Sequence, residues 1–352
     1  MQVQENIPLA PLTTFRIGGP ARFYVDAKSI ADVEAAVHFA RTRDLPLFIL
    51  GGGSNLLAAD SGWPGLVMRV AIDGIERRAR ELEGKAVFDV GAGDPWDHFV
   101  AHVVSADCAG VESLSGIPGS VGGTPVQNVG AYGQEVSETI ESVQVFDRKD
   151  NQVRELCSKA CGFSYRSSIF NTTERGRFVI LRVSYALTSG GKPHLEYADL
   201  TRHFDGREAA PTLAEVREAV RHIRAGKGML IVEGDPDCQS AGSFFKNPVL
   251  SEQQHQDLNK RSEAKKLIVP SYPALEKQHK VSAAWLVEHS GFSRGYALGR
   301  AGISSKHALA IVNRGGATAA EILALKNQVQ QRVEEIWGVR LETEPVFVGI
   351  NG

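Results

Sequence analysis

Residues 115–133 constrain the fold of this chain more than any other segment, because they read SGIPGSVGGTPVQNVGAYG. Six of these residues are glycine, two are proline, and none carries a charge. A flexible linker would contain more solvated polar residues, and a buried helix or strand would tolerate far less glycine. The composition is typical of backbone that passes close to a ligand and offers its N–H groups as donors, most often to a diphosphate.

A second glycine run, Gly51-Gly52-Gly53-Ser54-Asn55, follows the apolar residues 45–50. Neither run has the G-x-G-x-x-G spacing of a Rossmann fold or the G-x-x-x-x-G-K-[ST] spacing of a P-loop. Two such loops are instead typical of flavin domains that hold the FAD diphosphate without a Rossmann unit. No histidine lies between Asp44 and Asp97, so we expect FAD to be bound non-covalently. A pair of glycine-rich turns without a ligand remains the alternative at this point.

The composition of the whole chain limits the classes of protein to which it can belong. The 352 residues carry a formal net charge of −2, with 43% hydrophobic and 23% charged residues, which is ordinary for a globular enzyme. This balance gives no reason to expect a nucleic-acid partner. The N-terminus lacks the basic and apolar regions of a signal peptide, and no apolar run approaches the roughly 18 residues of a membrane span, so a cytoplasmic protein is predicted. Cysteine spacing suggests neither a disulfide nor a metal site.

Apolar periodicity predicts alternating strands and helices in the first half of the chain. The predicted strands are residues 21–25, 47–50, 66–70, 86–91, 143–146, 153–156 and 178–187, and the predicted helices are residues 29–41 and 95–106. In the second half, capping-box sequences at Thr212, Ser251 and Thr318 predict three helix starts. The polar residues 202–211 are predicted to form a domain boundary.

The sequence SAGSFFKNP, at residues 240–248, is unusual for a surface turn. Exposed phenylalanines lower solubility, so Phe244 and Phe245 are expected to pack inward. This would leave Ser243, Lys246 and Asn247 facing a cleft. Taken alone, a serine in such a turn more often caps the backbone than it catalyses, and no G-x-S-x-G nucleophile elbow surrounds Ser243.

Two charged positions stand among apolar or aromatic neighbours. Arg166 lies within FSYRSSIF, where a guanidinium is costly to bury unless it faces an anion or a carboxylate. Residues 339–347 are predicted to form a strand, which would place Glu342 and Glu344 on one face. Because Pro345 and apolar residues follow Glu344, we expect this carboxyl group to be partly buried.

Together these segments resemble the UDP-N-acetylenolpyruvoylglucosamine reductase family, flavoenzymes of peptidoglycan precursor synthesis. GGGSNLL, LSGIPGSVGGTPVQNVGAYG, FSYRSSIF, AGSFFKNP and LETEP occur in the family's order and cover nearly the whole chain. Residues 194–200 look like the loop of the family's type I members, in which a tyrosine, Tyr197 here, closes over the substrate.

The resemblance implies an α+β fold with an FAD-binding domain of the PCMH/vanillyl-alcohol-oxidase type and a C-terminal α+β substrate-binding domain. The FAD-binding domain would consist of two α+β subdomains, at residues 1–70 and 71–210. The substrate-binding domain would cover residues 211–338, and a C-terminal strand at 339–352 would carry Glu344.

The resemblance also implies a reaction, in which NADPH reduces FAD and reduced FAD then reduces UDP-N-acetylglucosamine enolpyruvate to UDP-N-acetylmuramate. Ser243 matches the family's proton donor, Arg166 the cation that binds the substrate carboxylate, and Glu344 the acidic group that polarises it. An enolate-like intermediate needs positive charge and a proton of this kind. The matching substrate-binding residues are Tyr197, Lys227 and Asn247. The matching FAD-binding residues are Gly51, Gly52, Gly53, Ser54, Asn55, Leu56, Ser115, Gly116, Ile117, Pro118, Gly119, Gly122, Gly123, Gln127, Asn128, Gly130, Ala131 and Tyr132.

Some positions depart from the family pattern. Ser164 and Ser167 stand where the family usually has Gly and Asp, and Ala297 lies in a segment where type I members often carry Gln. Two other functions share the glycine loops: an oxidase or dehydrogenase of the same flavin fold, and a non-enzymatic flavin-binding module. Neither needs AGSFFKNP or Arg166. The expected partners are the sugar nucleotide and NADPH, with no nucleic acid, no membrane and no metal, and a monomer is expected.

Overall fold

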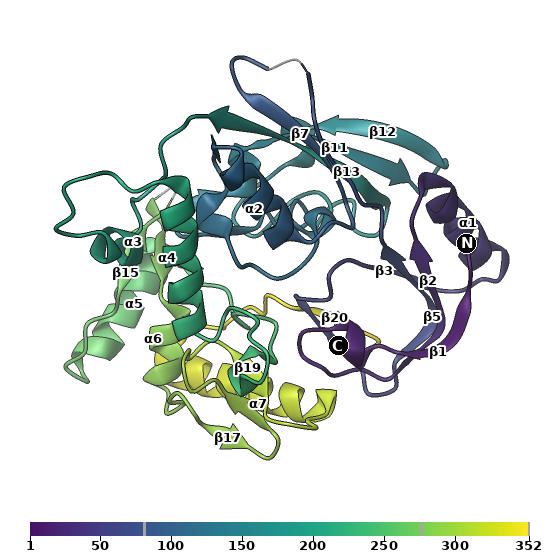
Figure 1. Ribbon diagram of the computed structural model, residues 1–352. Coiled ribbons are helices and arrows are strands. Elements are labelled where there is room, and N and C mark those ends of the chain that lie inside the picture. Colours follow the sequence, from purple (N-terminus) through teal and green to yellow (C-terminus); the bar gives the residue numbers. More distant parts are fainter. Residues whose placement is uncertain (80–81, 275–276, 351–352) are drawn as a thin grey trace. The chain divides into compact units, whose positions relative to one another are not determined.

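The computed structural model describes residues 1–79, 82–274 and 277–350 (Figure 1). It contains two compact units, each with its own hydrophobic core. The first unit comprises Met1–Ile7, Ala21–Gly53 and Trp63–Gly226, and the second comprises Pro8–Pro20, Ser54–Gly62 and Lys227–Gly352. Two short N-terminal segments therefore group with the C-terminal part of the chain. The domain division expected from the sequence, at residues 70, 210 and 338, does not include this grouping.

The first sheet of the first unit is largely parallel and carries one helix. Its strand order is β1 (Gln4–Pro8), β2 (Pro20–Ala27), β5 (Trp63–Val70) and β3 (Leu47–Leu50). β5 pairs in parallel with both β2 and β3. Helix α1 (Ile30–Thr42) begins after Ser29, whose hydroxyl accepts a hydrogen bond from the Asp32 N–H, and its apolar face is buried. β3 is an edge strand of this sheet and ends directly before Gly51, so the first glycine run begins at the edge of the sheet.

The second sheet of the first unit is antiparallel and forms the larger part of its core. Its strand order is β12 (Gln152–Cys157), β11 (Ile140–Asp147), β13 (Phe178–Ser189), β7 (Ala86–Gly91) and β6 (Ile75–Arg77), with β8 (Cys108–Ala109) also pairing with β13. Helix α2 (Trp96–Ser105) lies beside this sheet (Figure 1). Its Trp96 and Phe99 pack on Tyr185 of β13, with ring centroids 5.7 and 4.8 Å away.

Short elements complete the first unit. They are the 3₁₀ helices Glu112–Leu114, Val121–Gly123, Val136–Glu138 and Ser158–Cys161, the strands β9 (Gly130–Ala131) and β10 (Gln134–Glu135), and the helices α3 (Ala198–His203) and α4 (Leu213–Gly226). Before α4, the Glu215 N–H donates to the Thr212 hydroxyl at 3.2 Å, and the Thr212 N–H donates to the Glu215 carboxylate at 2.8 Å. The capping box predicted at Thr212 is therefore confirmed.

In the described part of the second unit, α-helices and several short strands pack around Phe244 and Trp337, which are both fully buried. Its elements are the 3₁₀ helices Ala10–Leu12 and Pro236–Cys238, the helices α5 (Glu252–Glu263), α6 (Ala283–Glu288) and α7 (Ala319–Trp337), and the strands β4 (Leu56–Ala58), β14 (Val249–Leu250), β15 (Ser271–Pro273), β16 (His279–Val281), β17 (Ala297–Leu298), β18 (Ala301–Ile303), β19 (Ile311–Asn313) and β20 (Val346–Val348). β4 pairs in parallel with β20, which explains why Ser54–Gly62 belongs to this unit. The capping boxes predicted at Ser251 and Thr318 are confirmed.

The secondary structure predicted for the first half is confirmed within a few residues at each end, including the hairpin of β11 and β12. The predicted C-terminal strand is wrong in extent, because only Val346–Val348 is a strand and residue 343 forms one isolated bridge with Phe245. Pro345 lacks an N–H group and interrupts strand pairing there. Within the described ranges, no helix is long and apolar enough to cross a membrane.

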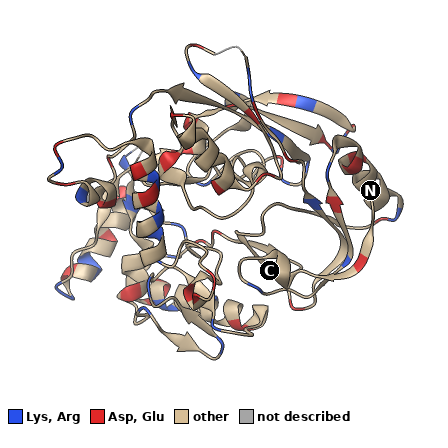
Figure 2. Cartoon of the chain, viewed as in Figure 1, with Lys and Arg blue, Asp and Glu red and all other residues tan. Residues whose placement is uncertain are grey.

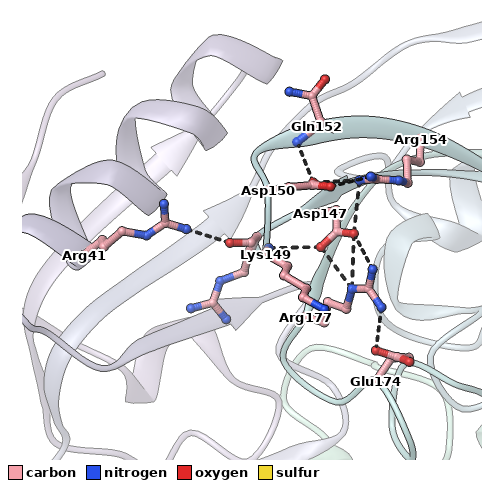
Figure 3. A network of polar contacts seen from close by, with 9 residues as sticks. Arg41, Asp147, Lys149, Asp150, Gln152, Arg154, Glu174 and Arg177 are labelled. Carbon is pink, nitrogen blue, oxygen red and sulfur yellow. Dashed lines mark hydrogen bonds and ion pairs between the residues drawn. The ribbon is translucent and has the colours of Figure 1, made fainter.

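A charged network closes the end of the β11–β12 hairpin (Figure 3). The Asp147 carboxylate is fully buried and accepts hydrogen bonds from Arg177 Nε at 3.0 Å, Arg177 Nη2 at 2.7 Å and Arg154 Nη1 at 3.1 Å. The hydrogen bonds from Arg177 are the main reason that the pKa of Asp147 lies below its usual range. Asp150 also binds Arg154 but is largely exposed.

We expect Asp147→Asn to destabilise the protein at pH 7 by about 1–3 kcal/mol, because it removes a buried carboxylate from two arginines that are themselves partly exposed. A lowered pKa in the folded state stabilises the fold above the unfolded pKa of about 3.9, and this stabilisation is lost as the pH falls through the folded pKa. The difference between wild type and variant should therefore shrink below about pH 4. Urea unfolding from pH 7 to pH 3 measures it.

Asp150→Asn is the matched control, since the same arginine is involved but the carboxylate is exposed. It should leave the free energy of unfolding nearly unchanged, because an exposed ion pair contributes little to stability. Equal losses for the two variants, or a loss for Asp147→Asn that persists unchanged at pH 3, would contradict the assigned role of the buried carboxylate.

Candidate functional site

The two glycine runs meet in the first unit. A Cβ atom added to Gly52 would lie 2.5 Å from the Gly119 Cα, and one added to Gly51 would lie 3.0 Å from the Ser120 hydroxyl oxygen. Backbone therefore packs directly on backbone, and no larger residue fits at position 52. The structure thus brings together two segments that are more than sixty residues apart in the sequence.

The second glycine run is held in place by the residues just before and within the start of α2. The Trp96 N–H donates to Gly119 O at 3.0 Å, the Val121 N–H to Asp94 O at 2.9 Å, and the Gly122 N–H to Ala92 O at 2.9 Å. A Cβ on Gly122 would lie 2.7 Å from the Ala92 Cβ, so close packing alone requires glycine at this position. These hydrogen bonds and this close packing hold the backbone of residues 119–122 in place.

Hydrogen-bond donors remain open where the two runs meet. The Ser120 hydroxyl is buried and has no partner among the described residues. The N–H groups of Gly51–Gly53 likewise donate to no protein acceptor in the part of the chain that the structure describes. Buried polar groups are almost always satisfied, so the Ser120 hydroxyl indicates a ligand with acceptor oxygens, and the nearby N–H groups are of the kind that bind such oxygens. Ser120 was not among the predicted FAD-binding residues, although a hydroxyl between Gly119 and Gly122 was a usable signal.

The other predicted FAD-binding positions have varied surroundings. The Gly116 N–H donates to the Asp97 carboxylate at 2.6 Å. The Asn128 side chain is buried, donates to Glu135 Oε2 at 2.8 Å and to Ser164 O at 3.1 Å, and accepts from the Ser137 N–H at 3.1 Å. The Asn128 side chain therefore joins the segments that contain Glu135, Ser137 and Ser164 by hydrogen bonds. Gly130 and Ala131 form β9.

Arg166 lies in the first unit on a tight turn. Ser164 and Ser167 exchange backbone hydrogen bonds of 3.0 and 3.1 Å, and Arg166 between them has φ of 54°. The guanidinium donates to Gly130 O at 2.6 Å and lies 5.4 Å from the Tyr165 ring centroid. The two hydrogen bonds between Ser164 and Ser167 join backbone groups, so serines at these positions are compatible with the turn.

Tyr197, also in the first unit, stands directly before α3 and is 43% exposed. Its ring packs edge-on against the ring of the buried Tyr132, with centroids 5.2 Å apart. The Thr201 hydroxyl donates to Leu195 O at 2.7 Å and so closes the chain around Tyr197. The side chain of Tyr197 is therefore partly accessible to a ligand.

Ser243 and Glu344 are brought together in the second unit. The Glu344 N–H donates to Phe244 O at 3.0 Å, and the Lys246 N–H donates to Glu342 O at 2.9 Å. Phe244 and Phe245 are buried, as predicted. Glu344 is partly buried, as predicted, whereas Glu342 is exposed.

Residues of the first glycine run continue into this region, since the chain passes from the first to the second unit between Gly53 and Ser54. The Asn55 amide donates to Glu344 O at 3.3 Å. The Thr14 hydroxyl lies 3.3 Å from Ser54 O and donates to Ser240 O at 2.6 Å. These contacts hold the backbone around Ser243 and Glu344 in one arrangement.

The remaining predicted substrate-binding residues, Lys227 and Asn247, also lie in the second unit. The Asn247 side-chain oxygen accepts the Ala283 N–H at 2.9 Å, at the start of α6. Burial, reinforced by the positive charges of Lys227 and Arg294, lowers the pKa of His307 to about 4, so this imidazole is neutral at pH 7.

Two family models match the chain. The model described as FAD binding domain matches residues 21–156, and the model described as UDP-N-acetylenolpyruvoylglucosamine reductase, C-terminal domain, matches residues 235–348. These matches confirm the predicted fold class, an FAD-binding domain of the PCMH type with a C-terminal reductase domain.

Relatives match over the whole chain. The UDP-N-acetylenolpyruvoylglucosamine reductase of Thermobifida fusca is 43% identical, over 99% of this chain and 98% of its own. That of Streptomyces avermitilis is 44% identical, over 100% and 97%. The crystal structure of the Thermus caldophilus enzyme (MurB) is 26% identical and superposes with a TM-score of 0.67 over 99% of each chain. The chain therefore belongs to the UDP-N-acetylenolpyruvoylglucosamine reductase family.

Proposed function

We propose that the chain uses NADPH to reduce UDP-N-acetylglucosamine enolpyruvate to UDP-N-acetylmuramate through non-covalently bound FAD. As a member of this family it is an FAD-dependent oxidoreductase, a UDP-N-acetylmuramate dehydrogenase of peptidoglycan precursor synthesis. The observation that carries the proposal for this chain is the set of open donors at Gly51–Gly53 and Ser120. NADPH as the reductant, a type I loop, a monomer and a cytoplasmic location belong to the same proposal.

The first unit fits the diphosphate of FAD. The Ser120 hydroxyl and the N–H groups of Gly51–Gly53 offer donors of the kind that bind phosphate oxygens, and no Cβ blocks their approach. The other predicted FAD-binding residues flank these donors in sequence. When bound, FAD supplies the hydride chemistry that links NADPH to the enolpyruvyl group.

The residues of the chain then have separate tasks. The Ser243 hydroxyl donates a proton to the carbon next to the substrate carboxylate, and Glu344 polarises that carboxylate group. Arg166 pairs with the carboxylate and stabilises the negative charge that develops beside it. Tyr197, Lys227 and Asn247 bind the diphosphate and sugar of the nucleotide. The hydrogen bond from the Glu344 N–H to Phe244 O supports a joint role of Ser243 and Glu344, because it keeps the two residues in a constant arrangement.

Denaturation should release intact FAD from the protein, and Ser120→Ala should weaken FAD binding. Loss of a hydrogen bond to a charged phosphate oxygen is worth about 1.5–3 kcal/mol, so the Kd for FAD should rise by about ten- to hundredfold. Flavin fluorescence titration measures this, with Ser105→Ala, an exposed serine at the end of α2, as the control. Flavin that stays attached to the unfolded chain would contradict non-covalent binding.

Ser243→Ala should leave the reduction of FAD by NADPH nearly unchanged, since no carbon is protonated in that half-reaction. Reoxidation by the enolpyruvyl substrate should slow by about a hundredfold or more, the scale of a lost positioned proton donor. Stopped-flow absorbance of the flavin separates the two half-reactions. Equal slowing of both would assign Ser243 a structural role only.

Glu344→Gln and Glu342→Gln form a matched pair in one segment. Glu344→Gln should slow reoxidation by about tenfold or more, because it removes the partly buried acidic group beside Ser243. Glu342→Gln should stay within about twofold of wild type, since its side chain is exposed. The same stopped-flow measurement distinguishes them, and similar rates for the two variants would reject the role of Glu344.

A further inference from the structure

A cluster of three charged residues outside the predicted site touches the FAD-binding loop directly. It consists of Asp97, in the first turn of α2, and of Arg217 and Arg221, one turn apart on α4. All three belong to the first unit. Basic residues recur along α4 in the charge-coloured view (Figure 2).

The Asp97 carboxylate is saturated by short hydrogen bonds. Oδ1 accepts from the Gly116 N–H at 2.6 Å and from Arg217 Nη1 at 2.6 Å, while Oδ2 accepts from Arg217 Nη2 at 2.9 Å and from Arg221 Nη1 at 2.7 Å. Arg217 therefore grips the carboxylate with two parallel bonds, a geometry that sets orientation as well as strength. Although burial acts to raise the pKa of Asp97, the hydrogen bonds from Arg217 and Gly116 hold it below its usual range, so the group is charged.

Asp97 binds the start of the loop that carries Ser120, through the Gly116 N–H. Gly116 has φ of 70°, at the point where the chain turns into the second glycine run. Beyond it, the loop is bonded to residues 92–96 through backbone groups, which do not depend on side-chain identity. Within the described residues, the Asp97 carboxylate is the side chain that joins the start of this loop to α4. Its loss would leave Gly116 without its acceptor.

We propose that Asp97, held by Arg217 and Arg221 of α4, is a positioning residue that sets the FAD-binding loop through the Gly116 N–H. The inference rests on the proposed function, since it assigns the loop of residues 115–123 to FAD. It links α4 to the cofactor site through Asp97 and the Gly116 N–H. Sequence patterns do not reveal this link, because Asp97 and Arg217 are 120 residues apart.

The test compares the FAD affinity of Asp97→Asn and Arg217→Lys with that of wild type. Arg217→Lys keeps the positive charge but loses the two parallel bonds, and Asp97→Asn keeps the shape but loses the charge. We expect each variant to raise the Kd for FAD by about ten- to hundredfold, the effect of losing one or two charge-assisted hydrogen bonds. The double variant should be no worse than the weaker-binding single variant, because both changes break one unit.

Arg207→Lys is the matched control, since Arg207 pairs with Glu215 at the start of α4 at 2.6 Å but does not contact the loop through that pair. It should leave the Kd within about twofold of wild type. Thermal unfolding of the FAD-free proteins is measured in parallel, because a purely structural role would lower the unfolding temperature and leave the Kd of the folded fraction unchanged.

An unchanged Kd in the folded Asp97→Asn or Arg217→Lys protein overturns the inference, and so does an equal rise in Arg207→Lys. Additive effects in the double variant also overturn it. These results would leave the proposed function intact, since wild type would still bind FAD. Wild-type protein that binds no FAD would overturn both.

Discussion

The close packing of Gly52 on Gly119 is the constraint on which the cofactor region depends. A Cβ at position 52 would come within 2.5 Å of the Gly119 backbone, so the two glycine runs meet only if both stay free of side chains there. This meeting places the N–H groups of Gly51–Gly53 beside the Ser120 hydroxyl, and none of these groups has a hydrogen-bond partner among the residues that the structure describes. Neither run alone forms this set of donors.

In the second unit, apolar burial and a short backbone pairing hold the chain around Ser243 in place. Phe244 is fully buried between Phe15 and Phe347, with ring centroids 6.2 and 6.3 Å away. This anchor fixes the backbone on which Ser243 lies, and the Glu344 N–H bonds to the carbonyl of the same phenylalanine. The groups that we propose to react therefore need little reorganisation, which is the property that makes positioned groups effective in catalysis.

Prediction from the sequence worked best where local chemistry decides the structure. The capping boxes at Ser251 and Thr318 specify helix starts within four residues, and the strands of the first unit follow apolar runs. The C-terminal segment was mispredicted because alternation alone suggested a strand, whereas Pro345 removes a ladder donor and only Val346–Val348 pairs. The sequence shows the Ser120 hydroxyl within the glycine loop, but its lack of a partner among the described residues becomes visible only when its neighbours are placed.

The sequence by itself determined the family, the glycine loops that imply FAD, and the motifs that contain Arg166, Ser243 and Glu344, because each lies within a short run of unusual composition. Only the tertiary structure decided which backbone donors stay open and which are used, as the bond from Gly116 to Asp97 illustrates. It also decided that Ser54–Gly62 folds with the C-terminal part of the chain through β4 and β20. The physical reason is that hydrogen-bond satisfaction and close packing depend on groups that are distant in sequence and adjacent only in space.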